Sequence, residues 1–249
     1  KSGIKFIEIG EKFGVIAALI PKNKKEFFTY EIATFRQDFG SIDSRHPKKV
    51  KLISDPKEDA IRRDFTINGM FGKITNCKLQ IANKSKISND KPKLKIENCL
   101  PSVAFAKEGK LKIIDYVGGI QDIQNKIIRF IGNPNERIKE DALRMLRAIR
   151  FSCQLGFTIE KESLDSIKKN KDLIKKISAE RVRDEINKIL VSPRRGQGIQ
   201  LLDHLGLLKI ILPELVSGKG VNQPANMHYE GDVWNHTLLS LSNIRKEKQ

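Results

Sequence analysis

The chain opens with short apolar runs and continues with helical periodicity. Apolar and β-branched residues fill 13–20 and 27–36, which predicts two neighbouring strands joined by the polar residues 21–25. From residue 133 onward the apolar positions recur at helical spacing. We expect helices over 161–175, 178–191, 196–205 and 206–212. The pattern therefore predicts a β-rich head followed by a helical body.

Two local signals place helix starts more sharply. Residues 55–58 and 133–136 each combine an N-cap side chain, a first-turn proline and an acidic residue in the first turn. After the second signal, four apolar residues share one helical face, and Gly156 supplies a helix terminator. They are Ala142, Leu146, Ile149 and Cys153.

Composition narrows the class of protein. The chain has 249 residues, 39% of them apolar, which is enough for one large or two small domains with cores. No apolar run approaches the roughly 18 residues of a membrane span, and no cleavable signal is visible. The three cysteines form no CxxC pair, which argues against a disulfide framework or a zinc finger. We expect a cytoplasmic protein with no membrane partner.

The net charge of +17 points to a polyanionic partner such as nucleic acid. A biased genome composition that raises the lysine content would give the same excess. Much of the charge lies in residues 73–112, where ten lysines accompany three acidic residues. We interpret this stretch as a basic insertion, poorly ordered or a loosely attached hairpin. A tolerated, solvated insertion is favoured over an RNA-binding arm.

Arginine usage is more informative than total charge. Lysine outnumbers arginine by 33 to 14, yet nine arginines gather in a few stretches, where a planar, bidentate donor is the natural interpretation. They are Arg62, Arg63, Arg129, Arg137, Arg144, Arg147, Arg150, Arg181 and Arg183. The alternative for any one of them is a surface ion pair.

Two segments carry candidate chemistry. Residues 62–68 (RRDFTIN) combine two cations, a carboxylate and an amide that could bind phosphates and a ribose hydroxyl. In residues 140–144 (EDALR), the i, i+3 spacing puts Asp141 and Arg144 on one helix face, where they could read the edge of a base. Taken alone, this second motif is better explained by an intrahelical salt bridge.

In order along the chain, these motifs resemble the class II tRNA nucleotidyltransferase (CCA-adding enzyme) and bacterial poly(A) polymerase family. The resemblance runs from about residue 10 to 240. It rests on residues 30–36 (YEIATFR), 62–68, 115–119 (DYVGG) with Asp122, 131–134 (IGNP), 140–151 (EDALRMLRAIRF) and 180–185 (ERVRDE).

The resemblance implies an α+β fold, a polymerase-beta-like nucleotidyltransferase head on a β-sheet followed by an all-helical neck and body. It implies transfer of nucleotides from CTP and ATP to the 3′ end of tRNA or another RNA, with Mg²⁺ as cofactor. A poly(A) polymerase is the alternative within the class. A noncatalytic RNA-binding remnant is the alternative outside it.

Carried over position by position, the resemblance implies a role for each candidate residue. Asp64 would contact the ribose, and Arg63 and Asn68 the triphosphate and sugar. Asp141 and Arg144 would be the template that reads cytosine or adenine, with Arg147 nearby. Asp115, Gly118 and Gly119 would form a flexible loop, Glu180 and Arg181 would brace the neck, and Glu31 would be an auxiliary active-site acid.

The family's paired metal-binding carboxylates, an Asp-x-Asp motif upstream of the first apolar strand, are missing, because residues 1–12 contain no aspartate. We therefore assign no metal ligand and expect residues 1–249 alone to be catalytically incompetent. A separately encoded N-terminal fragment is one possible partner.

The same reasoning divides the chain into three parts. Residues 1–128 would be a head truncated at its N-terminus, 129–219 the helical neck and body, and 220–249 the truncated start of an HD-like domain. His228 and His236 would be that domain's first candidate metal ligands, lacking their partners.

Overall fold

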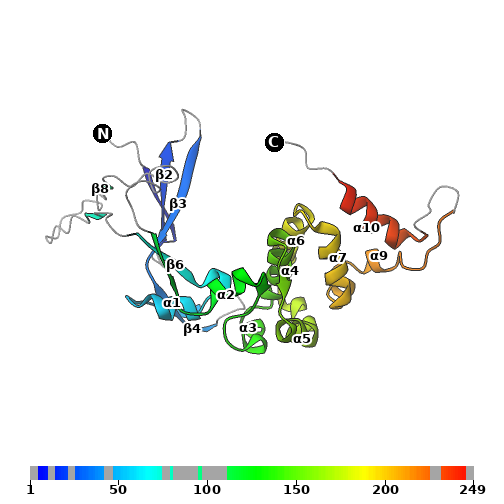
Figure 1. Cartoon of the computed structure of the whole chain (residues 1–249), viewed down its shortest axis with the longest axis horizontal. Coiled ribbons are helices and arrows are strands. Elements are labelled where there is room, and N and C mark those ends of the chain that lie inside the picture. Colours follow the sequence, from blue (N-terminus) through cyan, green and yellow to red (C-terminus); the bar gives the residue numbers. More distant parts are fainter. Residues whose placement is uncertain are drawn as a thin grey trace. The chain divides into compact units, whose positions relative to one another are not determined.

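The computed structural model describes part of the chain and divides it into two compact units. One unit comprises Lys1–Gly69 with Tyr116–Gln249, and the other Met70–Asp115. Figure 1 traces both along the sequence. The described residues are 5–10, 15–21, 26–41, 47–74, 79–80, 95–96, 111–224 and 231–244.

The first unit begins with strands. β1 (Lys5–Gly10), β2 (Val15–Pro21) and β3 (Phe27–Ala33) form an antiparallel sheet in that order, and β2 contributes the buried Ala17 and Ala18. The strand predicted over 13–20 is therefore confirmed.

The strand predicted over 27–36 divides instead into β3 and β4 (Arg36–Ser41), and β4 pairs with β5 (Pro47–Leu52). β3 ends at Ala33. The Phe35 carbonyl instead accepts a hydrogen bond from the Ile53 N–H at 2.9 Å, so residue 35 pairs with the segment after β5.

Both helix-start signals are confirmed. The Asp55 carboxylate accepts the Lys57 N–H at 2.8 Å at the start of α1 (Pro56–Ile61). The Asn133 side chain accepts the Asn135 N–H at 2.9 Å at the start of α3 (Pro134–Glu140). Between these two helices lie the short 3-10 turn η2 (Thr66–Asn68), α2 (Gly119–Gln124) and β10 (Ile127–Ile128).

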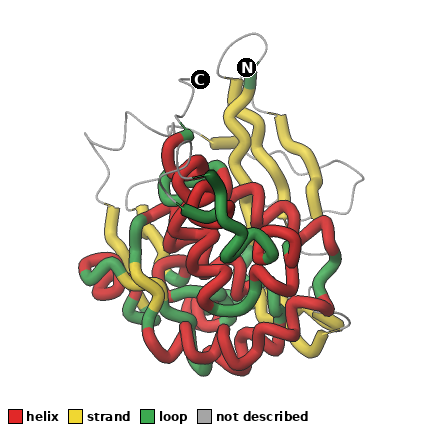
Figure 2. Tube along the Cα trace, turned by 90° about the vertical axis from the view of Figure 1, so that its right-hand side faces the viewer, coloured by secondary structure: helices red, strands yellow, loops and turns green. Residues whose placement is uncertain are grey.

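The body consists mainly of helices (Figure 2). Two predicted boundaries differ. The helix predicted over 161–175 ends at residue 170 and continues as a 3-10 turn. The helix predicted over 206–212 spans only 208–211, and Pro213 then begins a further helix, because proline suits a first helical turn. The elements are α4 (Arg144–Leu155), β11 (Thr158–Ile159), α5 (Lys161–Asn170), η4 (Lys171–Lys176), α6 (Ala179–Leu190), α7 (Arg195–His204), α8 (Leu208–Ile211), α9 (Pro213–Val216) and α10 (Val233–Asn243).

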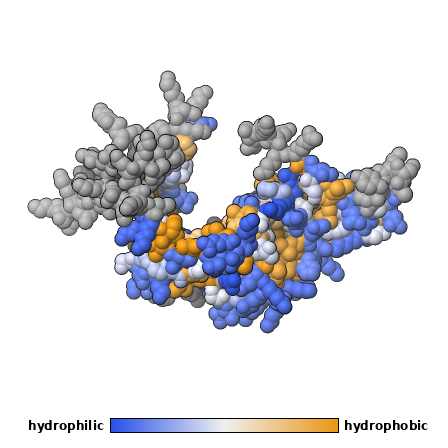
Figure 3. All heavy atoms as spheres, in the orientation of Figure 1, coloured by the Kyte–Doolittle hydropathy of each residue, from blue (hydrophilic) through white to orange (hydrophobic). Residues whose placement is uncertain are grey.

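One apolar core joins these helices. α4 supplies the fully buried Met145, Leu146 and Ile149, which belong to the same cluster as Ile189 of α6 and Leu202 of α7. Hydrophilic residues cover the outer side of α3 and α5 at the lower edge of Figure 3. No helix in the described part of the chain combines the length and apolar character needed to cross a bilayer.

The second unit contains β6 (Met70–Ile74) paired antiparallel with β9 (Leu111–Asp115), and β7 (Leu79–Gln80) paired with β8 (Lys95–Ile96). In the first ladder Ile74 lies opposite Leu111. The two ends of the basic insertion are therefore neighbours. Most of the insertion predicted over 73–112 lies outside the described residues.

Candidate functional site

Two segments far apart in the sequence meet at one cleft of about 530 Å³ in the first unit. The first segment follows α1, the second leads into α4, and Arg181 of α6 adds a third contribution. The lining residues are Arg62, Arg63, Asp64, Asn68, Asp141, Leu143, Arg144, Arg147 and Arg181. All six residues predicted to bind the nucleotide line this cleft, so the structure brings them together.

Backbone hydrogen bonds attach the first segment to the helical body. The Thr66 N–H donates to the Arg129 carbonyl, and the Ile131 N–H donates to the Asp64 carbonyl, each at 3.1 Å. Phe65 is fully buried, and its ring packs against Phe130 with centroids 4.9 Å apart. These contacts fix the position of Asp64 relative to the body.

Asp59 of α1 holds the two consecutive arginines. Its Oδ1 accepts bonds from Arg62 Nε at 2.9 Å and Nη2 at 2.5 Å, and its Oδ2 accepts bonds from Arg63 Nε at 3.0 Å and Nη2 at 2.8 Å. Burial alone would raise the pKa of this carboxyl, but the hydrogen bonds from Arg63 and Arg62 outweigh it and hold the pKa below its ordinary value. Asp59 was not among the predicted site residues, although its i, i+3 and i, i+4 spacing to Arg62 and Arg63 is visible in the sequence.

Asp64 is buried, with 8% of its surface exposed, and both of its oxygens are occupied. Oδ1 accepts the Phe65 N–H and the Asn68 side-chain amide, each at 2.9 Å. Oδ2 accepts Arg147 Nε at 2.7 Å and Nη2 at 2.5 Å. Arg147 also lies 5.5 Å from the centre of the Phe151 ring, which holds its guanidinium beside the carboxylate.

Asp141 and Arg144 do not share a helix face, so that prediction is wrong. α3 ends at residue 140, Asp141 has an extended backbone, and Arg144 is the first residue of α4. The chain turns because the Asp141 carboxylate accepts the Leu143 N–H at 3.0 Å, which favours a turn over a continuous helix. Both side chains nevertheless line the same cleft.

The expected Asp141–Arg144 salt bridge is not the pairing that the structure shows. Asp141 Oδ2 accepts Arg181 Nη2 at 2.8 Å, so Arg181 of α6 belongs to the cleft as well as to the neck. Arg144 Nη1 donates to Glu140 and, at 2.8 Å, to the Arg137 carbonyl. The carboxylate and the guanidinium are thus each fixed by a separate partner.

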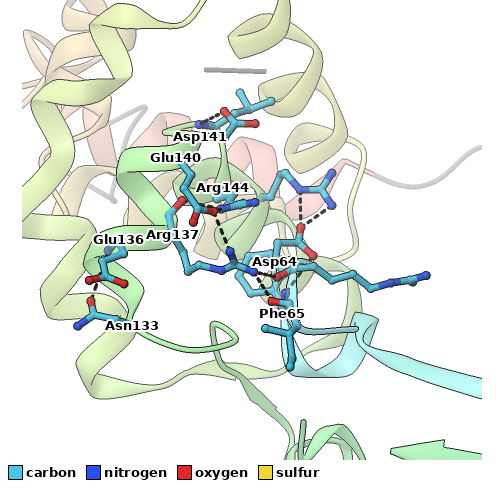
Figure 4. Close-up of polar contacts among 12 residues, drawn as sticks. Asp64, Phe65, Asn133, Glu136, Arg137, Glu140, Asp141 and Arg144 are labelled. Carbon is cyan, nitrogen blue, oxygen red and sulfur yellow. Dashed lines mark hydrogen bonds and ion pairs between the residues drawn. The ribbon is translucent and has the colours of Figure 1, made fainter. Parts of the chain in front are cut away.

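Arg137 links the two segments, and the sequence analysis gave it no individual role. From α3 its Nη2 donates to the carbonyls of Ile61 at 2.5 Å and Arg63 at 2.6 Å, while Nη1 donates to Glu140 at 2.8 Å. Figure 4 shows this side chain extending from α3 toward the segment that carries Asp64. Burial is the main reason that the Arg137 pKa lies below its ordinary value, with the nearby Arg144 charge adding to it.

A second polar network surrounds Asp122. Asp122 of α2 accepts Thr66 Oγ1 at 2.7 Å and Arg129 Nε at 3.1 Å, and Arg129 also donates to Glu160. Its bond to Asp122 is the main reason that the Arg129 pKa lies above its ordinary value. This network joins η2 to the body. It gives one of the nine clustered arginines a structural role.

Buried and exposed ion pairs account for two more of the clustered arginines. Arg150 of α4 donates to Glu185 of α6 at 3.0 Å, and both side chains are buried. Burial lowers the Arg150 pKa, against the opposing charge of Glu185. Arg183 is exposed and pairs with Asp184 at 3.3 Å, which is the surface ion pair that the alternative interpretation expected.

The remaining predicted residues lie elsewhere. Glu31 is exposed on β3 and does not line the cleft. Asp115 ends β9 in the second unit, whereas Gly118 has a left-handed φ of 82° just before α2, and the buried Gly119 begins that helix. The flexible-loop role of these three stays a prediction.

Two further residues had roles in the neck and in an HD-like site. Glu180 is exposed in the first turn of α6. His236 lies on α10, whereas His228 lies outside the described residues.

The carboxylates near the cleft do not fit a metal ion. The carboxylate oxygens of Asp59 and Asp64 accept hydrogen bonds from guanidinium and amide donors, and Asp141 is paired with Arg181. Within the described ranges, no three His, Cys, Asp or Glu side chains are grouped as metal ligands. Mg²⁺, which the family resemblance implies, is therefore not assigned to these residues.

Two protein-family models match the chain, one in the β-rich N-terminal part and one in the helical body. Residues 1–83 match the poly A polymerase head domain, and residues 156–218 match a domain described as the probable RNA- and SrmB-binding site of polymerase A.

Curated relatives extend the match across most of the chain. The CCA-adding enzyme of Bacillus velezensis is 34% identical over 203 residues, which are 82% of this chain and 41% of that enzyme. The CCA-adding enzyme of Bacillus subtilis is 36% identical over 196 residues, 79% of this chain and 39% of that enzyme. The chain thus spans about two fifths of the length of these relatives.

Solved structures agree at the level of the fold. The Bacillus stearothermophilus CCA-adding enzyme in complex with CTP superposes with a TM-score of 0.57 at 28% identity, covering 82% of this chain and 39% of that one. A CCA-adding enzyme in its apo form II gives a TM-score of 0.59 at 21% identity, covering 86% of this chain and 41% of that one, and supports the fold alone.

Fold and comparisons together define an α+β nucleotidyltransferase head followed by a helical body, as predicted. The chain belongs to the family of class II tRNA nucleotidyltransferases and bacterial poly(A) polymerases, which confirms the resemblance found in its motifs.

Proposed function

We propose that this chain supplies the nucleotide-recognition part of a CCA-adding enzyme, and that its cleft binds CTP and ATP for addition to the 3′ end of tRNA. One observation carries the proposal. A single cleft gathers five arginines and two carboxylates from three separate segments, and each carboxylate is held by a guanidinium. The relatives named as CCA-adding enzymes, one of them solved with CTP, support the choice of nucleotides.

The proposed base reader is the pair Asp141 and Arg144. Cytosine and adenine each present an exocyclic amino donor beside a ring-nitrogen acceptor, so a carboxylate next to a guanidinium matches both bases. Uracil and guanine present the two groups in the reverse order. A carbonyl acceptor replaces the amino donor and a ring N–H replaces the ring-nitrogen acceptor, so both bases mismatch the same pair. Because Arg181 holds Asp141 and Glu140 holds Arg144, the cleft offers this pattern without further ordering.

The proposed sugar and phosphate contacts are Asp64, Asn68 and Arg63. A carboxylate has about four acceptor positions, and Asp64 already accepts four bonds from protein donors. A ribose hydroxyl would therefore displace Asn68 or Arg147 from Asp64. Nucleotide binding at Asp64 is thus an exchange of hydrogen bonds within the cleft.

We place RNA on the helical half, where the RNA-binding family model matches residues 156–218. The proposed division is residues 1–128 as head, with the basic insertion at 73–112, and 129–219 as neck and body. Residues 220–249 would begin an HD-like domain. Residues 1–249 alone are proposed to bind nucleotides without transferring them, because residues 1–12 contain no aspartate to form the family's Asp-x-Asp pair.

Calorimetry with CTP, ATP, UTP and GTP tests the recognition proposal. We expect CTP and ATP to bind residues 1–249 more tightly than UTP and GTP. Asp141→Ala or Arg144→Ala should weaken CTP and ATP by about tenfold or more, since each removes a charged hydrogen-bonding partner. Arg183→Ala is the matched control, because Arg183 is exposed and outside the cleft.

Binding of tRNA without measurable affinity for any nucleotide would contradict this proposal and favour the noncatalytic RNA-binding alternative. Equal affinity for all four nucleotides would overturn the base-reader assignment.

An incorporation assay tests the second part of the proposal. Residues 1–249 with tRNA, CTP, ATP and Mg²⁺ should yield no extended product. Addition of CCA by this chain alone would overturn the expected incompetence and establish CCA addition. A run of adenosines would instead favour the poly(A) polymerase alternative.

A further inference from the structure

Asp59 is the most completely enclosed carboxylate next to the cleft. Asp59 lies on α1, and only 1% of its surface is exposed. It does not line the cleft itself. Its partners Arg62 and Arg63 both line the cleft. The carboxylate therefore acts on the cleft through those two side chains.

Each oxygen of Asp59 serves one guanidinium. Arg62 directs Nε and Nη2 at Oδ1, and Arg63 directs Nε and Nη2 at Oδ2, over distances of 2.5–3.0 Å. With two nitrogens of one guanidinium on the same oxygen, the plane of each guanidinium is restricted.

Each guanidinium has a second anchor on a backbone carbonyl. Arg62 Nε also donates to the Arg36 carbonyl at 2.9 Å, and Arg63 Nη1 donates to the Asn68 carbonyl at 2.9 Å. The Arg36 N–H in turn donates to Asp59 Oδ1 at 3.3 Å, which connects α1 to the start of β4. Both guanidinium groups are therefore fixed in direction as well as in place.

We propose that Asp59 is a positioning residue that orients Arg62 and Arg63 to bind the phosphate chain of a nucleoside triphosphate. The inference rests on the proposed function and adds a specific device to it. Two guanidinium groups share one carboxylate, so a single residue orients both of them. Guanidinium groups bind phosphate by geometry as well as charge, and fixing them beforehand removes an entropic cost of binding.

Asp59→Asn separates positioning from simple charge neutralisation, because the two effects have opposite signs. The substitution removes a negative charge near the cleft, so a purely electrostatic role predicts tighter binding of phosphates. It also replaces one carboxylate oxygen with an amide that donates, so one guanidinium loses its acceptor. Positioning therefore predicts weaker binding of phosphates despite the more positive cleft.

Titration calorimetry with CTP, cytidine and sodium tripolyphosphate supplies the readout. We expect Asp59→Asn to weaken CTP and tripolyphosphate by about tenfold, with cytidine affinity unchanged and the folded state confirmed by circular dichroism. A general structural defect would weaken cytidine as well. Asp172→Asn, which removes an exposed carboxylate paired with Lys175, is the matched control. Unchanged or tighter binding of CTP and tripolyphosphate, or an equal loss for cytidine, would overturn the proposal.

A measurement on the unsubstituted chain decides the matter if Asp59→Asn fails to fold. Arginine Nε–H resonances, assigned with Arg62→Lys and Arg63→Lys, should exchange with water more slowly for both residues than for the exposed Arg183. Tripolyphosphate should shift these two resonances without accelerating their exchange. Exchange as fast as that of Arg183, or no shift with tripolyphosphate, would contradict the positioning role.

The two proposals fail separately. If the chain binds tripolyphosphate in an Asp59-dependent way but neither CTP nor ATP, the positioning role stands and the proposed function fails. If CTP binds normally to Asp59→Asn, the proposed function stands and the positioning role fails.

Discussion

Three carboxylates near the cleft hold guanidinium groups, one of them locally and two of them across long stretches of the chain. Asp59 binds Arg62 and Arg63, which follow it closely in the sequence. Asp64 binds Arg147 across 83 positions, and Asp141 binds Arg181 across 40. The local pairing was visible in helical spacing, whereas the two distant pairings depend on how α4 and α6 pack. Charge totals could not reveal this arrangement, because the pairs cancel in the sum.

The first prediction concerns acid stability. Because its pKa is lowered in the folded state, ionised Asp59 stabilises the fold above its unfolded pKa of 3.8, and the contribution is lost as pH falls further toward the folded pKa. At neutral pH, Asp59→Asn should lower the free energy of unfolding by about 1–3 kcal/mol, since a buried donor loses its partner.

Urea unfolding between pH 7 and pH 3 provides the check. The difference between wild type and Asp59→Asn should shrink in the acid range. A difference that stays constant or grows toward pH 3 would contradict the assignment of Asp59 as the charged partner.

The second prediction concerns Cys153, which lies on α4 and belongs to the apolar core. Burial raises the pKa of its thiol to about 11, so almost none of it is thiolate at pH 8. Iodoacetamide at pH 8 should leave Cys153 unmodified in the native protein and modify it in urea, as read from the peptide that contains it by mass spectrometry. Equal labelling rates in the two conditions would show that this part of the core opens readily.

At the scale of elements, helix starts were predictable and the turn between α3 and α4 was not. The caps at Asp55 and Asn133 act on neighbouring N–H groups, so the sequence alone specifies them. The break at 141–143 interrupts a continuous helical pattern of apolar residues, and it is accompanied by contacts with α6 that spacing does not show. The residues that line the cleft were therefore predictable from the sequence, whereas their ion pairs were not.

The third prediction concerns Gly156, which ends α4 as the sequence indicated. Its φ of 72° lies in the left-handed region, and a Cβ there would overlap the Arg194 guanidinium. Gly156→Ala should destabilise the fold by about 1–2 kcal/mol from backbone strain, with Arg194 moving aside. Thermal unfolding measures this, and the double variant Gly156→Ala/Arg194→Ala separates strain from overlap. A double variant as stable as Arg194→Ala alone would contradict the strain.

At the scale of the whole molecule, the chain forms two compact units, and the basic insertion belongs to the smaller one. Ile74 and Leu111 face each other in the β6–β9 ladder, so a two-residue turn could join these strands directly. The cleft residues all belong to the larger unit. Nucleotide recognition should therefore not depend on the insertion.

The fourth prediction tests that independence. Replacing residues 75–110 with Asn-Gly should leave CTP affinity unchanged within about twofold, because all cleft residues belong to the larger unit, and tRNA affinity should also persist at physiological salt. Calorimetry and filter binding provide the two measurements. A loss of tRNA affinity alone would make the insertion an RNA-binding arm, and a loss of CTP affinity would contradict the independence of the larger unit.

Arg137 has a consequence for how the parts of a nucleotide cooperate. Its side chain donates to the carbonyls of Ile61 and Arg63, while its own carbonyl accepts from Arg144. We therefore expect that occupation of one end of the cleft biases the other end through Arg137. Such linkage is reciprocal: tripolyphosphate should raise the affinity for free cytidine by the same factor as cytidine raises that for tripolyphosphate. A complete nucleotide would then bind more tightly than its separated halves suggest, and the cleft would discriminate against fragments of a nucleotide.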